Sequence, residues 1–235
     1  MKTGTLYLIP SWLGKTTLAS VLPAGNLDIV SRLRHFIVEE PSTARRFLRQ
    51  TGFTASFDAV MLMVFNEHSG TSDLHGYLEP VLQGHDTGLL SEAGVPCVAD
   101  PGALIVEEAH LAGIRVVPLT GPSSVILALM ASGFNGQQFA FHGYLPIGQA
   151  ERSRKIRELE RTALEKGQTQ IFIETPYRNR QMLAALAETC GKNTRICVAA
   201  DLTLETEWIR VRTAEEWKRE KPDIHKRPAV FLISG

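Results

Sequence analysis

The chain has 235 residues, of which 44% are hydrophobic and 21% are charged, and its basic and acidic side chains cancel to a formal net charge of +0. This composition is typical of a globular protein with a large core and excludes a disordered chain. The three cysteines have neither CxxC nor metal-ligand spacing, so we expect no disulfide framework, no metal site and a reducing, cytoplasmic setting. The first residues do not resemble a signal peptide and no apolar run reaches membrane-spanning length, so we expect no membrane partner.

Apolar runs separated by turn residues predict alternating strands and helices in the first half of the chain. We expect strands at residues 5–9, 35–38, 60–65 and 115–119, and helices at residues 27–33, 43–50, 74–82 and 103–112. Asn26 and Ser42 are the expected N-caps of the first two helices. The run at 60–65 is apolar throughout, which is typical of a strand covered by helices on both faces.

The second half continues the alternation. We expect strands at residues 139–142, 169–173, 195–200, 207–212 and 229–233, and helices at residues 124–131, 151–166 and 178–189. Thr213 and Glu216 form a capping box that opens a further short helix. The pattern predicts an α/β fold in two α/β domains, residues 1–119 and residues 120–235.

Residues 89–102 form the stretch around which the chain is organised. An apolar strand end is followed by Gly94, Pro96, Pro101 and Gly102, and a helix begins directly afterwards. Proline fixes φ and glycine permits close approaches, so this loop is rigid and shaped. Loops at the carboxyl ends of strands are where open α/β sheets bind ligands. The alternative is an ordinary connection between a strand and a helix.

A second loop repeats this pattern at residues 116–125. A strand again leads into Gly121 and Pro122, followed by Ser123, Ser124 and a helix. For Ser123 taken alone, a helix N-cap is the better explanation. Two such loops in one domain favour the floor of a ligand-binding cleft.

Four motifs in a fixed order carry a family resemblance. They are the two loops within residues 88–132, Gly-Tyr-Leu-Pro at 143–146, and Glu-Thr-Pro-Tyr-Arg at 174–178. The chain resembles the tetrapyrrole methylase superfamily, and within it the ribosomal RNA small subunit methyltransferase I branch. The resemblance implies an S-adenosylmethionine-dependent methyltransferase with two α/β domains, a cofactor cleft between them, and a homodimeric assembly.

The resemblance also implies which residues contact the methyl donor, S-adenosylmethionine. No GxGxxG loop or Walker A lysine is present, which argues against other nucleotide-binding folds. Phe141, one of the implied residues, is better explained by a place in the core. The implied donor contacts are Gly94, Val95, Pro96, Val98, Ala99, Asp100, Ser123, Ser124, Phe141, Glu174, Thr175, Ala200, Leu202, Pro228 and Ala229.

Charged residues at strand ends are candidates for assisting the methyl acceptor. Methyl transfer from a sulfonium depends mainly on positioning, so a strong catalytic signature is not required. Glu39 and Glu67 follow predicted strands and Arg178 opens a helix, and in a doubly wound sheet such ends converge at the ligand edge. The alternative is that each is a solvated strand-end residue or a cap.

The acceptor side of the motifs departs from the branch. Residues 10–14 read Pro-Ser-Trp-Leu-Gly where the branch has PIGNLEDI, the Asp-Thr-Arg of AEDTR is missing after Glu39, and Tyr177 replaces a histidine. The resemblance implies as partner ribosomal RNA or the small ribosomal subunit, with a ribose 2′-hydroxyl of 16S ribosomal RNA as the acceptor. A small tetrapyrrole-like substrate and a non-catalytic donor-binding protein remain as alternatives.

Two basic clusters could contact phosphates of such an RNA. One comprises the arginines of the helix at 43–50, and the other lies at the start of the helix at 151–166, beside the loop at residues 143–148. The alternative is a solvated helix face balanced by neighbouring glutamates. The clusters consist of Arg45, Arg46 and Arg49, and of Arg152, Arg154, Lys155 and Arg157.

Overall fold

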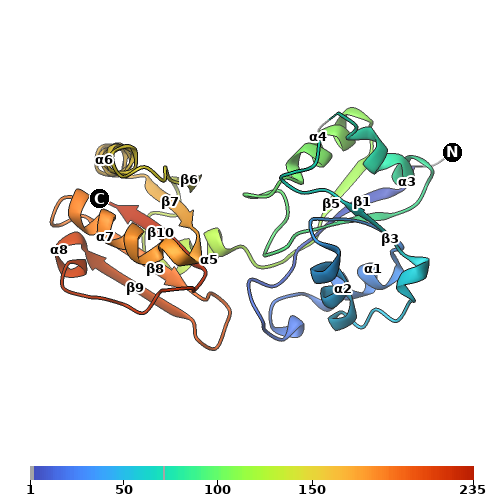
Figure 1. Cartoon of the computed structure of the whole chain (residues 1–235), viewed down its shortest axis with the longest axis horizontal. Helices are drawn as coiled ribbons and strands as arrows, with labels where there is room; N and C mark the ends of the chain where they lie inside the picture. Colours follow the sequence, from blue (N-terminus) through green and yellow to red (C-terminus); the bar gives the residue numbers. More distant parts are fainter. Residues whose placement is uncertain (1–2, 71) are drawn as a thin grey trace. The chain divides into compact units, whose positions relative to one another are not determined.

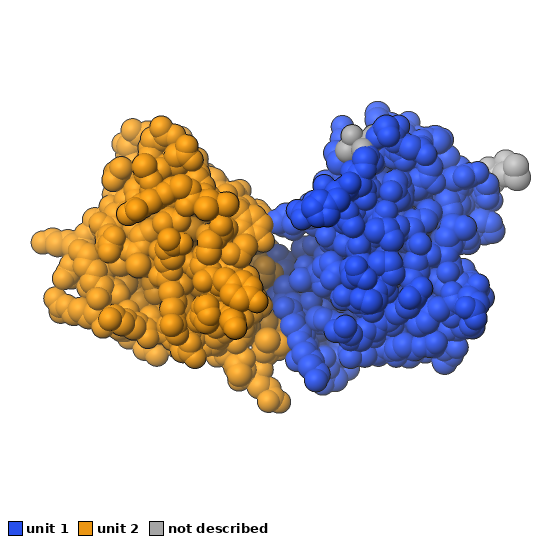
Figure 2. All heavy atoms as spheres, in the orientation of Figure 1, with its two compact units in different colours: residues 1–123 blue, residues 124–235 orange. Residues whose placement is uncertain are grey.

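A computed structural model describes residues 3–70 and 72–235 and divides the chain into two compact units, residues 1–123 and residues 124–235 (Figure 2). The sequence places the boundary after Leu119, whereas the contacts within the structure place it after Ser123. Gly121, Pro122 and Ser123 of the second loop therefore belong to unit 1, and Ser124 begins unit 2.

Unit 1 is built on a parallel five-stranded sheet with the order β3-β2-β4-β1-β5 (Figure 1). All of its strand pairs are parallel, so the carboxyl ends of the strands lie at one edge. The residues that follow each strand are therefore brought to this edge by the topology alone. The strands are β1 (Thr5–Ile9), β2 (His35–Val38), β3 (Met61–Val64), β4 (Thr87–Leu90) and β5 (Arg115–Pro118).

Helices cover both faces of this sheet and form two cores. Side chains alternate along a strand, so Phe36 of β2 packs with Phe47 of α2, whereas Ile37 packs with Ile105 of α4 on the opposite face. The α-helices are α1 (Ala24–Arg32), α2 (Pro41–Gln50), α3 (Glu79–Leu82) and α4 (Ala103–Leu111), and short 3-10 helices lie at Leu18–Ser20 (η1), Phe57–Ala59 (η2) and His75–Leu78 (η3).

Two helix starts in unit 1 differ from the sequence prediction. Asn26 lies inside α1, where its side-chain amide donates to the Thr120 carbonyl, so it does not cap the helix. Glu40 caps α2 by accepting from the Ser42 backbone, because Pro41 suits the first helical turn and moves the start upstream. The single helix expected at 74–82 is divided into η3 and α3, and Pro80 lies in the first turn of α3.

The apolar strand expected at 60–65 is present as β3, but it is an edge strand. Met61 is 51% exposed and Val64 is 40% exposed, so the prediction of complete burial was wrong. An uninterrupted apolar run fits an edge position as well as a central one, because strand order is decided by tertiary pairing and not by local pattern.

Unit 2 contains a mixed five-stranded sheet with the order β6-β7-β10-β8-β9. β10 lies at the centre between antiparallel partners and is buried along its whole length, and β9 is a half-exposed antiparallel edge strand. The strands are β6 (Phe139–Tyr144), β7 (Thr169–Glu174), β8 (Arg195–Ala200), β9 (Trp208–Thr213) and β10 (Ala229–Ser234).

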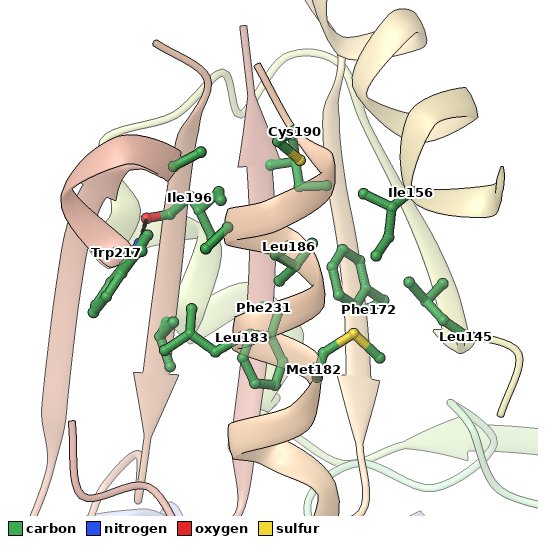
Figure 3. Packing of buried hydrophobic residues seen from close by; sticks show 14 of the residues in the cluster. Leu145, Ile156, Phe172, Met182, Leu183, Leu186, Cys190, Ile196, Trp217 and Phe231 are labelled. Atoms are coloured by element: carbon green, nitrogen blue, oxygen red, sulfur yellow. Dashed lines mark hydrogen bonds between the residues drawn. The ribbon is translucent and has the colours of Figure 1, made fainter. Parts of the chain in front are cut away.

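The helices of unit 2 pack on both faces of this sheet. Figure 3 shows Leu183 and Leu186 of α7 directed toward Phe172 and Phe231 of the central strands. In the same cluster the Trp217 indole N–H donates to the Ile196 carbonyl at 3.0 Å. The helices are α5 (Ser124–Ser132), α6 (Gln149–Lys166), the 3-10 helix η4 (Pro176–Arg178), α7 (Asn179–Thr189) and α8 (Ala214–Trp217).

The capping box predicted at Thr213 is present. Thr213 Oγ1 accepts from the Glu216 N–H, and the Glu216 carboxylate accepts from the Thr213 N–H at 2.7 Å. This reciprocal pair begins α8 and so fixes where the Trp217 ring enters the core. Within the described part of the chain, none of the helices is both long and apolar enough to span a membrane.

The central position of β10 gives a stability prediction. Phe231 is fully buried and stacks on Phe172 with ring centroids 5.9 Å apart, so Phe231→Ala should lower the free energy of unfolding of unit 2 by about 3–5 kcal/mol. Phe139→Ala, at a position 40% exposed on the edge strand β6, is the matched control and should cost far less. Urea unfolding followed by the fluorescence of Trp208 and Trp217, in a Trp12→Phe background, measures both. Equal losses would show that β10 does not carry the core.

Candidate functional site

Three loops are joined at the carboxyl edge of the unit 1 sheet. Beyond the ends of the strands, the Ser91 N–H donates to the Ile9 carbonyl at 3.3 Å, and the Leu119 N–H donates to the Leu8 carbonyl at 3.0 Å. The Asn26 side chain then holds the Thr120 carbonyl at 2.7 Å. The loops that follow β1, β4 and β5 are therefore held in one arrangement.

Gly94 sits where two of these loops meet. Its N–H donates to the Trp12 carbonyl, and its own carbonyl accepts from the Ser11 N–H at 2.9 Å. A Cβ at this position would lie 2.9 Å from a methyl of Leu13 and 3.1 Å from the Pro122 carbonyl oxygen, and the φ angle is +73°. Only glycine fits this junction without strain.

The backbone beyond Gly94 is strained at two residues that are not glycine. Cys97 has φ 68° and Ala99 has φ 56°. Such conformations persist only where the surrounding structure imposes them, and they cluster at ligand sites. Gly94 and Pro96 are buried, whereas Val98 is 47% exposed and Ala99 is exposed. Val98 and Ala99, at the strained tip of this loop, are therefore accessible.

A group of carboxyl groups lies beside this loop. Glu39 follows β2 and lies close to Asp100 and Glu92 of the loop that follows the neighbouring strand β4. Burial raises the pKa of Glu39 to about 7, the negative charge of Asp100 adds to the rise, and hydrogen bonding from the Glu92 backbone opposes it. The pKa of Glu92 is also raised, first by burial and then by the charge of Glu40. Glu39 can therefore exchange a proton near neutral pH.

Asp100 is held by the helix that it precedes. Its Oδ1 accepts from the Gly102 N–H at 2.7 Å at the start of α4, so its carboxylate orientation is set locally. Burial and the charge of Asp100 raise the pKa of Cys97 to about 12, so this thiol stays protonated at neutral pH and is a poor nucleophile.

Glu67 is placed differently from Glu39, although both follow strands of the same sheet. Its side chain is 83% exposed and lies 3.5 Å from His68 in the turn after β3. In the same turn, the Asn66 side-chain amide donates to the backbone carbonyl of Glu39 at 3.4 Å. At the carboxyl edge of the sheet, Glu39 therefore lies beside the loop that follows β4, whereas Glu67 lies on the surface.

Most of the expected donor residues of unit 2 lie at one end of its sheet. In the strand register Ala229 is opposite both Glu174 and Ala200. Phe141 differs, because it pairs with Ile171 in the middle of β6 and is half-buried. The residues gathered at the sheet end are Glu174, Thr175, Ala200, Leu202, Pro228 and Ala229.

Two ion pairs organise this end of unit 2. Glu174 is buried, and its Oε1 accepts from Arg178 Nε and Nη2 at 3.0 and 2.6 Å and from the Thr175 N–H at 2.6 Å. The side chain of Arg178 is therefore engaged within unit 2. Asp201, directly after β8, accepts from Arg227 at 2.7 Å and from the Thr206 hydroxyl at 2.8 Å.

Sequence reasoning missed the Asp201 pair. The available signal was the polar residue that directly follows the apolar strand 195–200, but Arg227 is far away in the sequence, and only strand order brings the two together. The backbone turns sharply here, with positive φ at Asp201 and Thr203.

The two basic clusters are only partly available to a partner. Arg49 and Arg45 lie over the Phe57 ring, and Arg49 also donates to the Phe53 carbonyl. Arg152 is only 3% exposed, and it donates to the Ile147 carbonyl. The interpretation of Arg152 as part of a solvent-facing cluster was wrong, because its side chain turns back onto the loop that precedes its own helix.

Comparison with known proteins identifies the family of this chain. Residues 31–218 match the sequence model of the tetrapyrrole (corrin/porphyrin) methylases. The ribosomal RNA small subunit methyltransferase I of Haemophilus influenzae is 30% identical over 239 residues, covering 99% of this chain and 79% of that protein. The enzyme of the same name from Bacillus subtilis is 35% identical over 217 residues, covering 90% and 68%. The crystal structure of the methyltransferase CobJ matches with a TM-score of 0.66 at 16% identity, covering 99% of this chain and 95% of that one.

The chain belongs to the tetrapyrrole (corrin/porphyrin) methylase family. It is a methyltransferase by family, and the likeness to CobJ shows the α/β fold of that family. The resemblance drawn from the four motifs is thereby confirmed.

The raised pKa of Glu39 predicts a pH-dependent stability. Because its pKa is about 7 in the folded state against an ordinary 4.5, its contribution to stability is full below pH 4.5 and is lost as the pH rises to about 7. Glu39→Gln should remove this loss from the stability profile. Glu67→Gln, at an exposed glutamate, is the control and should leave the profile unchanged. Denaturant midpoints between pH 4 and 8 measure both variants, and a sloping profile retained by Glu39→Gln would contradict the assignment.

Proposed function

We propose that this protein transfers a methyl group from S-adenosylmethionine to a ribose 2′-hydroxyl of 16S ribosomal RNA. The observation that carries this proposal is the rigid loop at residues 91–102, whose strained tip is exposed at the carboxyl edge of a parallel sheet. The two relatives with the name ribosomal RNA small subunit methyltransferase I, matched over nearly the whole chain, support the RNA acceptor.

The residues of the loops fit the chemistry of the donor. Peptide groups of the strained turn and the small side chains of Val98, Ala99 and Ser123 suit an adenine ring and a methionine tail, and neighbouring Gly94, Val95 and Pro96 give the loop its shape. When bound, S-adenosylmethionine supplies an electrophilic methyl group. The protein's main task is then to align the acceptor with it. In unit 2 we propose that the residues at the sheet end also contact the donor, with the Glu174 carboxylate oriented by Arg178.

Glu39 is our candidate for receiving the proton of the acceptor hydroxyl. A group whose pKa lies near the working pH is suited to this task. Burial first, and then the charge of Asp100, raise the pKa of Glu39 to about 7, and Asp100 is itself held by the Gly102 N–H. Glu67 is exposed and is proposed to contact the RNA rather than the reacting atoms. By family resemblance we also propose that the protein is cytoplasmic and forms a homodimer. Light scattering of the purified protein would test the dimer.

Donor binding should depend on Gly94. Isothermal titration should give micromolar affinity for S-adenosylmethionine and S-adenosylhomocysteine, and Gly94→Ala should weaken both at least tenfold because the new Cβ displaces Leu13 or Pro122. Gly113→Ala is the matched control, since Gly113 has a similar φ of +68° but no heavy atom within 4 Å of the added Cβ. Loss of affinity in both variants, or in neither, would contradict the placement of the donor site.

The acceptor is tested with small ribosomal subunits from a strain that lacks the relevant methylation. The protein should transfer radiolabelled methyl groups to 16S ribosomal RNA, and the labelled nucleotide should resist alkaline cleavage, as a 2′-O-methylated ribose does. Label on a base would exclude the ribose acceptor. Label only in a small-molecule extract would favour a tetrapyrrole-like substrate, and donor binding without any transfer would indicate a non-catalytic protein. Glu39→Gln should reduce transfer while donor affinity stays the same.

A further inference from the structure

Tyr177 is an exposed aromatic residue with two basic neighbours. It lies in the 3-10 helix η4, directly after the end of β7, and is 70% exposed. The Lys226 ammonium lies 5.7 Å from the centre of its ring, and the His225 ring meets it edge to face at 6.2 Å. A large exposed ring so close to a lysine is a surface suited to a ligand that is both planar and anionic.

The backbone that carries these three side chains is firmly held. The Lys226 N–H donates to the Pro176 carbonyl at 3.0 Å. The fully buried Asn179 side chain donates to the carbonyls of Ile224 and Arg227 at 3.0 and 2.6 Å. Two segments distant in sequence are thereby joined, so Tyr177 and Lys226 keep their relative positions without a ligand. Preorganisation of this kind reduces the entropy lost on binding.

The segment at residues 218–227 is basic, although the chain as a whole is neutral. It contains five lysines and arginines against two acidic residues. Both acids are engaged, Glu220 by Arg212 at 2.9 Å and Asp223 by Arg180 at 3.1 Å. Three of the five cations are also paired, Lys218 and Arg219 with Glu215 and Arg227 with Asp201. Among residues 3–70 and 72–235, no carboxylate forms an ion pair with Lys226. Its charge is therefore available to a phosphate.

We propose that Tyr177, His225 and Lys226 form a platform on which an unpaired base of single-stranded RNA stacks, with Lys226 contacting an adjacent phosphate. This inference rests on the proposed function, because it identifies part of the surface that holds the RNA substrate. Bases in an A-form duplex are already stacked and paired, so an exposed aromatic ring selects unpaired segments. An acidic peptide would use the cations but not the ring face, and it becomes an outcome of the test.

The test measures binding of a fluorescent, unstructured oligocytidylate to the full chain by anisotropy at fixed salt. Tyr177→Ala should weaken binding about tenfold to a hundredfold, whereas Tyr177→Phe, which keeps the ring, should bind like the unmodified protein. Lys226→Ala should weaken binding and lower the slope of log affinity against log salt by about one. Lys166→Ala, at an exposed lysine at the end of α6, is the charge control and should have no effect.

Several results would overturn the platform. They are equal affinity of Tyr177→Ala and the unmodified protein, equal loss in Tyr177→Phe, equal affinity for duplex RNA, or a preference for an acidic peptide.

Donor affinity and methylation of small ribosomal subunits are measured on the unmodified protein in parallel. If it methylates ribosomal RNA while Tyr177→Ala binds RNA normally, the platform is wrong and the proposed function stands. If it neither binds nor methylates RNA, both fall. Unchanged donor affinity of Tyr177→Ala shows that the variant is folded.

Discussion

The close approach of Gly121 to Pro10 is the constraint on which the carboxyl edge of unit 1 depends. A Cβ on Gly121 would lie 2.3 Å from two carbons of the proline ring, so the loops that follow β1 and β5 can meet only because one residue has no side chain. Gly94 makes the corresponding junction between the loops that follow β1 and β4. Three loops are thereby held against each other, and the loop that follows β4 contains the positive φ angles of Cys97 and Ala99. A loop fixed in this way can present its peptide groups to a ligand without first having to be ordered.

The same packing creates the unusual environment of Glu39. Adjacent strands β2 and β4 end at the same level, so the residue after β2 faces the loop after β4 and meets Asp100. The pKa of Glu39 rises first because the side chain is partly buried, and then because the negative charge of Asp100 lies close to it. The proton-exchanging property of Glu39 is thus a consequence of strand order. It does not come from any residue next to Glu39 in the sequence.

Unit 2 uses charge differently. Glu174 with Arg178 and Asp201 with Arg227 are ion pairs between largely buried groups, and each acid also accepts a hydrogen bond from a neighbouring residue. Pairs of this kind fix geometry more than they add stability, because the cost of removing both charges from water offsets their attraction. They hold the turns after β7 and β8. The Asn179 side chain donates to the Arg227 carbonyl, and the Arg227 side chain donates to the Asp223 carbonyl. These hydrogen bonds fix the backbone that bears Lys226 next to η4, which bears Tyr177.

The sequence alone determined the alternation of strands and helices, the two shaped loops, the capping box at Thr213 and the family, because each is written in neighbouring residues or in motifs of fixed spacing. It could not decide strand order. The prediction therefore placed β3, an edge strand, under helices on both faces, and it gave Glu39 and Glu67 the same candidate role. It also assigned Arg152 to the solvent and overlooked Asp201, whose partner lies on another segment. The neutral total charge concealed a basic segment at residues 218–227. Contacts between residues distant in the chain depend on the packing of the sheets, and only the tertiary structure decided them.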